Sequence, residues 1–238
     1  MHRFANPTRA LKIADRVLPW STAIAAVLIV LGLYYGLYDS PMDYLQKNSV
    51  RIMYIHVPSA WMALFIYTFI ATASAIGLIW RHPLADIAAK AAAPIGAGFT
   101  FVCLVSGSLW GRPTWGTYWV WDARLTSVLV LFFLYLGYMA LWQAFDDPNR
   151  AARAAAILAL VGFVNIPIIK FSVDWWNTLH QGASLSFTQD KIAFSMLRPL
   201  LLMAGGFTAY FVSVLIYRVR TEILARRVQV LQLARTRG

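Results

Sequence analysis

The sequence predicts an all-α integral membrane protein with six transmembrane helices, and two observations carry that prediction. Of the 238 residues, 60% are hydrophobic and only 13% are charged, which is far too apolar for an ordinary soluble domain. The charged residues stand between long apolar runs, most of them close to the roughly 20 residues that a helix needs to cross the hydrocarbon core. Lipid must therefore be the solvent for most of the chain.

The predicted spans form one domain with no internal repeat. They lie at about residues 18–38, 58–80, 91–110, 124–145, 153–171 and 197–217, followed by a basic tail over residues 218–238. The first run is too long for the apolar region of a signal peptide and no convincing cleavage site follows it, so we expect it to be retained as an anchor. The fifth reaches full length if Lys170 lies at the interface and extends its ammonium group outward.

The basic residues predict the orientation of the spans. Of the 21 Lys and Arg residues, 14 fall on the side that holds both termini, so the positive-inside rule places the termini and the tail in the cytoplasm. Three segments then face the periplasm, at about residues 39–57, 111–122 and 170–194. The formal charge of +11 follows from this topology, and it does not indicate nucleic-acid binding because no basic stripe lies on a soluble fold.

Tryptophan is concentrated in and beside the second of these segments. Four of the ten tryptophans occur within residues 110–121, whereas an aromatic belt at the lipid headgroups would serve both interfaces equally. The four are Trp110, Trp115, Trp119 and Trp121. In helical form Trp115 and Trp119 would share one face. Such a broad, flat surface suits a large planar ligand such as a porphyrin.

Charged side chains adjoin the same cluster. Arg112 and Arg124 are candidates to meet carboxylates such as porphyrin propionates. A pairing of Arg124 with Asp122 is an equally good interpretation for a charge near an interface. The sequence leaves both open.

Two of the four histidines, His56 and His180, fall on the periplasmic side, one in each segment that flanks the tryptophans. The other two, His2 and His82, fall in the cytoplasm. A single interfacial histidine is usually just a polar residue at the headgroups. Two at the same depth favour a shared role, because six-coordinate haem iron takes one axial nitrogen from each of two imidazoles.

Local patterns support inward-facing imidazoles. If residues 42–56 form an interfacial helix, His56 lies on its apolar face. If Ser172 caps a short helix that stops at Gly182, His180 shares a face with Trp176. We therefore expect both rings to point toward the tryptophan-rich segment.

Three motifs resemble a known family. The run from Trp110 to Thr126 resembles the tryptophan-rich WWD signature of haem-handling membrane proteins. The runs Ile55 to Trp61 and Asp174 to Gly182 resemble the two histidine segments of the CcmC family. Other WWD proteins, CcmF and the system II cytochrome c synthetases, are much larger. The likeness covers most of the chain.

The resemblance implies that the protein binds haem b, non-covalently and transiently, at the periplasmic face of the bacterial inner membrane. His56 and His180 would be the axial ligands of the iron. The surrounding site would include Trp110, Trp115, Trp119, Trp121, Asp122 and Arg124. The partners implied are the haem chaperone CcmE, the ABC-transporter subunits CcmA and CcmB, the small membrane protein CcmD, and membrane lipid.

The chain itself is not expected to be an enzyme. It contains no phosphate-binding loop of the G-x-x-x-x-G-K-[ST] type, so any ATP hydrolysis would belong to a partner. Its single cysteine, Cys103, allows no internal disulfide, and no C-x-x-C-H motif attaches haem covalently.

Two rival functions remain. A cytochrome b-type electron carrier would use histidine pairs inside its spans, and a haem permease would need ionisable residues along a central pathway. The apolar runs offer neither apart from His56 at the mouth of one span. Surface handling of haem is therefore the preferred interpretation.

Overall fold

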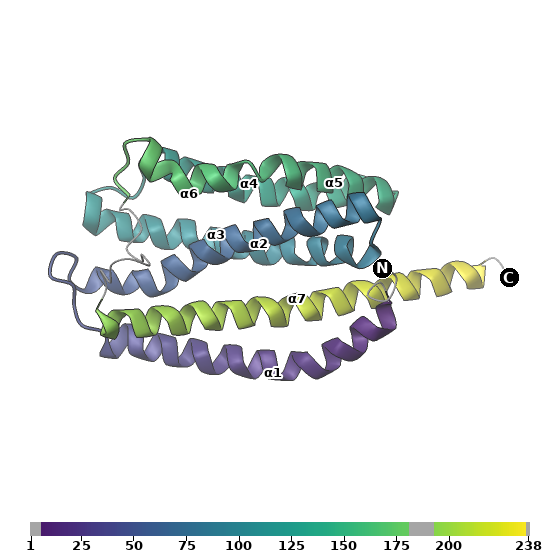
Figure 1. Ribbon diagram of the computed structural model, residues 1–238, viewed down its shortest axis with the longest axis horizontal. Helices are drawn as coiled ribbons and strands as arrows, with labels where there is room; N and C mark the ends of the chain where they lie inside the picture. Colours follow the sequence, from purple (N-terminus) through teal and green to yellow (C-terminus); the bar gives the residue numbers. More distant parts are fainter. Residues whose placement is uncertain (1–5, 181–192, 237–238) are drawn as a thin grey trace.

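The structure, a computed structural model, describes residues 6–180 and 193–236 as a bundle of long helices lying side by side (Figure 1). Within these residues, six helical segments are long and apolar enough to span a membrane, which confirms the predicted fold class. They are Pro7–Asp39, Asn48–Trp80, Pro83–Trp115, Ala123–Gln143, Pro148–Trp175 and Phe194–Val228.

Several helices are interrupted or extended relative to the predicted apolar runs. Helix α1 (Pro7–Tyr34) continues through a π-helical turn (Tyr35–Asp39), and a short 3-10 helix (Asn48–Ile52) leads into α2 (Met53–Trp80). The fifth span consists of α5 (Pro148–Gly162) and α6 (Asn165–Trp175) with a short break between them. The remaining helices are α3 (Pro83–Trp115), α4 (Ala123–Gln143) and α7 (Phe194–Thr236).

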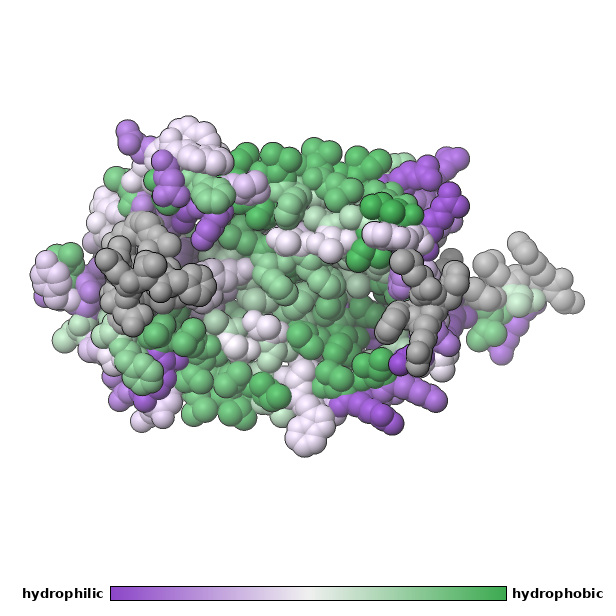
Figure 2. Space-filling model, viewed as in Figure 1, coloured by the Kyte–Doolittle hydropathy of each residue, from purple (hydrophilic) through white to green (hydrophobic). Residues whose placement is uncertain are grey.

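On the face shown in Figure 2, a broad apolar band lies between two polar ends of the bundle. Large hydrophobic side chains on this band, such as Ile24, Phe133 and Val161, are at least half exposed. Exposure of such apolar surface to water would be unfavourable, whereas lipid chains can cover it. Helix α7 runs beyond the bundle at the end where α1 begins (Figure 1).

The core is built around α2 and α3, the most enclosed of the spans. Small residues on α3 let neighbouring helices approach closely, and a Cβ at Gly96 would lie 2.2 Å from the Tyr135 ring of α4. The Tyr135 hydroxyl donates a hydrogen bond of 2.7 Å to the carbonyl of Ala63 on α2. Because membrane helices gain little from hydrophobic association, such packing and buried hydrogen bonding hold the bundle together.

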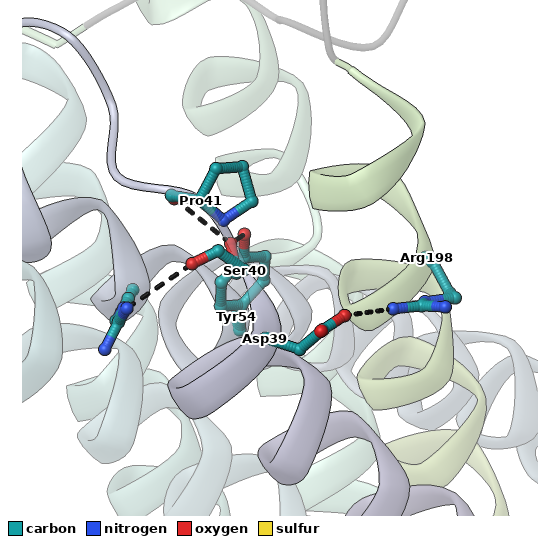
Figure 3. Close-up of polar contacts among 6 residues, drawn as sticks. Asp39, Ser40, Pro41, Tyr54 and Arg198 are labelled. Atoms are coloured by element: carbon teal, nitrogen blue, oxygen red, sulfur yellow. Dashed lines mark hydrogen bonds and ion pairs between the residues drawn. The ribbon is translucent and has the colours of Figure 1, made fainter.

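The start of α2 is tied to α1 and α7 by polar contacts (Figure 3). The hydroxyls of Ser40 and Tyr54 are hydrogen-bonded to each other, and Tyr54 is almost fully buried. Arg198 of α7 forms an ion pair of 2.5 Å with Asp39 (Figure 3), and its guanidinium carbon lies 3.7 Å from the Tyr35 ring centroid. Tyr54 precedes His56 by two residues, so this junction fixes the first turn of α2.

Three local predictions are wrong. Residues 42–56 are not one helix, because Asp43 and Lys47 pair in a tight bridge before the 3-10 helix begins. The helix that contains Trp115 ends there, because Gly116 has φ +79° and closes α3, so Trp119 lies outside it.

The third wrong prediction concerns Ser172. It lies inside α6 and does not cap a new helix, since α6 ends at Trp175 and Trp176 is extended. The predicted end of that helix, Gly182, lies outside the described residues.

Candidate functional site

The end of the bundle where α2 begins and α3 finishes brings His56 and His180 together. Their ring centroids are 6.4 Å apart, with 34° between the ring planes. His56 comes from the first turns of α2 and His180 from the segment that follows α6. The pairing of these two histidines, which are far apart in the sequence, agrees with the expectation that they share one site.

His56 is held by α3 and is only 9% exposed. Its Nδ1 lies 3.0 Å from the Cys103 carbonyl and 3.2 Å from Ser106 Oγ. A carbonyl oxygen can only accept, so Nδ1–H is the donor and the neutral ring keeps the lone pair of Nε2. A backbone partner on Nδ1 is the usual way in which a protein orients an imidazole that ligates metal through Nε2.

Gly107 provides the space for the His56 ring. A Cβ at this position would lie 2.8 Å from His56 Cε1, closer than real Cβ atoms approach. The backbone of α3 therefore orients the His56 imidazole and sets how closely the ring packs against α3.

His180 is held by a different kind of contact. Its backbone N–H donates to Thr178 Oγ1 at 3.0 Å, and the Thr178 hydroxyl donates in turn to Asp122 Oδ2. The ring also lies beside Trp115, with a centroid separation of 6.0 Å. His180 thus depends on side chains that belong to the tryptophan-rich segment.

Two of the four predicted tryptophans contact the histidines. Trp110 meets His56 edge to face at 5.7 Å, and its Nε1–H donates to Gln46 Oε1 at 2.9 Å. Trp115 lies against His180. Both occur in the last two turns of α3, so the tryptophan cluster is part helix and part loop.

The other two tryptophans lie in the loop. Trp119 and Trp121 pack against each other at 5.5 Å and 75°. Trp121 is 75% exposed, while Nε1 of Trp119 is buried without a hydrogen-bond acceptor among the described residues. Both lie in the predicted periplasmic loop, but no ring contact within residues 6–180 and 193–236 places either of them against an imidazole.

Asp122 and Arg124 have partners within the protein. Asp122 Oδ1 accepts from Leu125 N at 2.8 Å and caps α4, while its Oδ2 accepts from Thr178. Arg124 donates to Ser172 Oγ at 3.0 Å and to the Lys170 carbonyl at 3.2 Å. Arg124 therefore connects the start of α4 to the end of α6, and Asp122 connects it to the segment that follows α6.

Four residues that the sequence analysis missed complete the site. Ser106 and Gly107 seat His56, Thr178 connects His180 to Asp122, and Gln46 anchors Trp110. Only Thr178, two residues before His180, had a local signal. The others come from distant parts of the sequence.

The spacing of the two rings fits one metal atom between them. A metal–imidazole bond of about 2 Å on each side, plus slightly more than 1 Å from nitrogen to ring centre, gives centroids roughly 6 Å apart. The described residues contain no group of three or more His, Cys, Asp or Glu side chains able to hold an ion. Two histidines at this spacing would suit a metal that brings further ligands of its own, as haem iron does.

The fold defines a multi-pass membrane protein, and paired histidines beside tryptophan rings are the kind of site that accepts haem. Comparison with known proteins identifies the family. A family model described as heme exporter protein C matches residues 1–234. The chain therefore belongs to the heme exporter protein C (CcmC) family, which confirms the resemblance found in its motifs.

Individual relatives agree along nearly the whole chain. Heme exporter protein C of Bradyrhizobium diazoefficiens is 60% identical over 230 residues, covering 96% of this chain and 87% of the relative. The protein of the same name from Escherichia coli strain K12 is 48% identical over 241 residues, covering 100% of this chain and 98% of the relative. That of Haemophilus influenzae is 46% identical over 240 residues, covering 99% and 98%.

Proposed function

We propose that this protein binds haem b non-covalently between His56 and His180, and presents it to the haem chaperone CcmE during maturation of c-type cytochromes. The observation that carries the proposal is the facing pair of imidazoles, 6.4 Å apart at their centroids, beside the rings of Trp110 and Trp115. The name of the relatives, heme exporter protein C, supports haem as the cargo.

The chemistry of the site suits holding haem for transfer. Two neutral imidazoles coordinate the iron without a covalent bond to the porphyrin, and each can be exchanged separately. The one cysteine, Cys103, is buried in α3 and contributes its carbonyl to His56. It is not placed to attach a vinyl group, so covalent chemistry on the haem would belong to the chaperone.

The site lies at the periplasmic face of the bacterial inner membrane in this proposal. The cytoplasmic side is assigned by the 14 of 21 basic residues that accompany the two termini. The histidines lie at the opposite end of the bundle, where Trp121, Trp175 and Trp176 are exposed. Exposed tryptophans there suit both the headgroup region and a docking partner.

The protein acts in this scheme as the binding component of an ABC-type complex with CcmA, CcmB and CcmD. It has no phosphate-binding loop, so nucleotide hydrolysis by a partner supplies the energy for release. The chain contributes ligands, aromatic surface and orientation, and it is not an enzyme.

An optical spectrum of the purified protein tests the site. We expect a low-spin, bis-imidazole spectrum from the wild type, and its loss in His56→Ala and in His180→Ala. His82→Ala is the matched control, because His82 precedes α3 at the other end of the bundle and should keep the wild-type spectrum. A wild-type spectrum from the double variant His56→Ala/His180→Ala would refute the ligand assignment.

Pull-down of the chaperone tests presentation. We expect a stable complex only when haem is loaded, because the haem edge forms part of the surface that the chaperone meets. The His56→Ala/His180→Ala variant serves as the haem-free control. Equal recovery of the chaperone with haem-free protein would contradict the mechanism.

A further inference from the structure

The segment that carries His180 is attached to the start of α4 by a chain of hydrogen bonds. His180 N–H donates to Thr178 Oγ1, the Thr178 hydroxyl donates to Asp122 Oδ2, and Asp122 Oδ1 accepts from Leu125 N. The chain uses both carboxylate oxygens of Asp122. It starts in the segment after α6 and ends in the backbone of a membrane-spanning helix.

This attachment matters because α6 does not extend to His180. The helix ends at Trp175, Trp176 is extended, and residues 177–180 form no regular element. A segment of this kind has many backbone conformations of similar energy, so a few side-chain bonds decide where its imidazole lies.

A second contact fixes the end of α6 against the start of α4. Arg124, two residues after Asp122, donates to Ser172 Oγ at 3.0 Å and to the Lys170 carbonyl at 3.2 Å. Ser172 is fully buried. The end of α6 is therefore fixed against α4, which leaves residues 176–180 as the part that the Asp122–Thr178 contact must place.

We propose that Asp122 is a positioning residue that holds His180 opposite His56 through Thr178. It acts on the geometry of the site without touching the haem. This inference rests on the proposed function, since it assigns the way in which one of the two proposed ligands is set.

Thr178→Val tests the inference most directly, because valine keeps the shape of threonine and removes the hydroxyl. We expect the low-spin spectrum of the loaded protein to convert largely to a high-spin one, with His56 still bound. Thr178→Ser keeps the hydroxyl and should restore the wild-type spectrum, which a loss of packing alone would not explain.

The matched control is Thr114→Val. Thr114 is exposed in the same tryptophan-rich region, and among the described residues its hydroxyl bonds only to the Trp110 carbonyl of its own helix. It should leave the spectrum unchanged. If Thr178→Val retained the wild-type low-spin spectrum, the inference would be overturned.

A measurement on haem-free protein separates this inference from the proposed function. Hydrogen–deuterium exchange across residues 176–180 should be at least about fivefold faster in Thr178→Val, because the change removes two ordinary hydrogen bonds, the one to Asp122 and the one from His180 N–H. Unchanged exchange would overturn the attachment whatever the haem does. Failure of the wild type to show bis-imidazole haem would overturn the proposed function instead.

Asp122→Asn provides an independent test. Asparagine is also a good helix N-cap, so α4 is preserved while one acceptor for Thr178 is lost. Asp147→Asn is the control, since Asp147 caps α5 by accepting from Asn149 N. We expect Asp122→Asn and Thr178→Val together to change the spectrum no more than either alone. Additive effects would show that Asp122 acts by another route.

Discussion

The two histidines of the site are held by opposite means. His56 stands on α2 and is fixed by the backbone of α3, through the Cys103 carbonyl and the close approach of Gly107. His180 follows the end of α6 and is placed by side chains, through Thr178 and Asp122. One imidazole is therefore part of the helical core, and the other is attached to it.

The difference sets how easily each ligand can leave. Moving His56 requires its buried imidazole to leave the Cys103 carbonyl between α2 and α3, one of the most extensive helix pairs of the bundle. The segment that carries His180 is held through Thr178 by hydrogen bonds, each of which contributes only about 0.5–1.5 kcal/mol net. If the protein holds haem for transfer as proposed, one fixed and one adjustable ligand would allow it both to retain the haem and to release it.

The largest expected effect comes from removing each ligand in turn. His56→Ala should weaken haem retention at least about tenfold more than His180→Ala, equivalent to about 1.4 kcal/mol, because the backbone of α3 orients His56. Haem titration of the purified variants measures this difference. Equal losses, or a greater loss with His180→Ala, would contradict the asymmetry.

A nearly equal effect is expected from the glycine that seats His56. In Gly107→Ala the new Cβ would lie 2.8 Å from His56 Cε1, so the ring must shift from its present position relative to His180. We expect loss of most low-spin haem. Gly98→Ala, on the same helix with no atom within 4 Å of the new Cβ, should bind haem as the wild type does. A normal spectrum from Gly107→Ala would mean that the ring has room the structure does not show.

The sequence predicted the overall fold because span length and hydropathy are local properties. A run of about 20 apolar residues must be a helix in lipid whatever its neighbours are. It could not predict where the helices end within the site. Gly116 stops α3 after Trp115, and the break after Trp175 depends on how α6 meets α4.

The sequence singled out candidate site residues to the extent that their residue types are rare. Histidine and tryptophan stand out in a membrane protein. They drew attention to His56, His180, Trp110 and Trp115, which lie together in the structure. Ser106 and Thr178 are common residue types that matter only through a contact made in three dimensions. The charges of Asp122 and Arg124 were conspicuous, but their partners within the protein were not predictable without the fold.

A smaller effect is expected from Trp115, the aromatic residue beside His180. Trp115 lies beside His180, and replacing it with alanine should cost roughly 1.5–3 kcal/mol of apolar contact with bound haem. That corresponds to about a tenfold to hundredfold loss of affinity. Trp121→Ala is the control, because Trp121 is 75% exposed and packs on Trp119. Equal losses in both variants would favour a general headgroup role for these tryptophans.

The smallest effect is expected from a change at Ser106, because the Nδ1–H of His56 has a second acceptor in the Cys103 carbonyl. In Ser106→Ala the Nδ1–H of His56 loses a contact of 3.2 Å but keeps the Cys103 carbonyl at 3.0 Å, so the tautomer and the direction of the ring are preserved. The lost serine hydroxyl leaves nothing unsatisfied in its own helix, since it donates to the Val102 carbonyl, which also serves the helix. We expect a change below about 1 kcal/mol, less than about fivefold in haem affinity, with the low-spin spectrum intact.

Thr178→Val also removes one hydroxyl, but that hydroxyl is the link between His180 and Asp122, so its effect should be clearly larger. Haem titration and the midpoint potential of both variants, measured in the same detergent, test the ranking. If Ser106→Ala proved as damaging as Thr178→Val, the backbone of α3 would not be the rigid support that distinguishes His56 from His180.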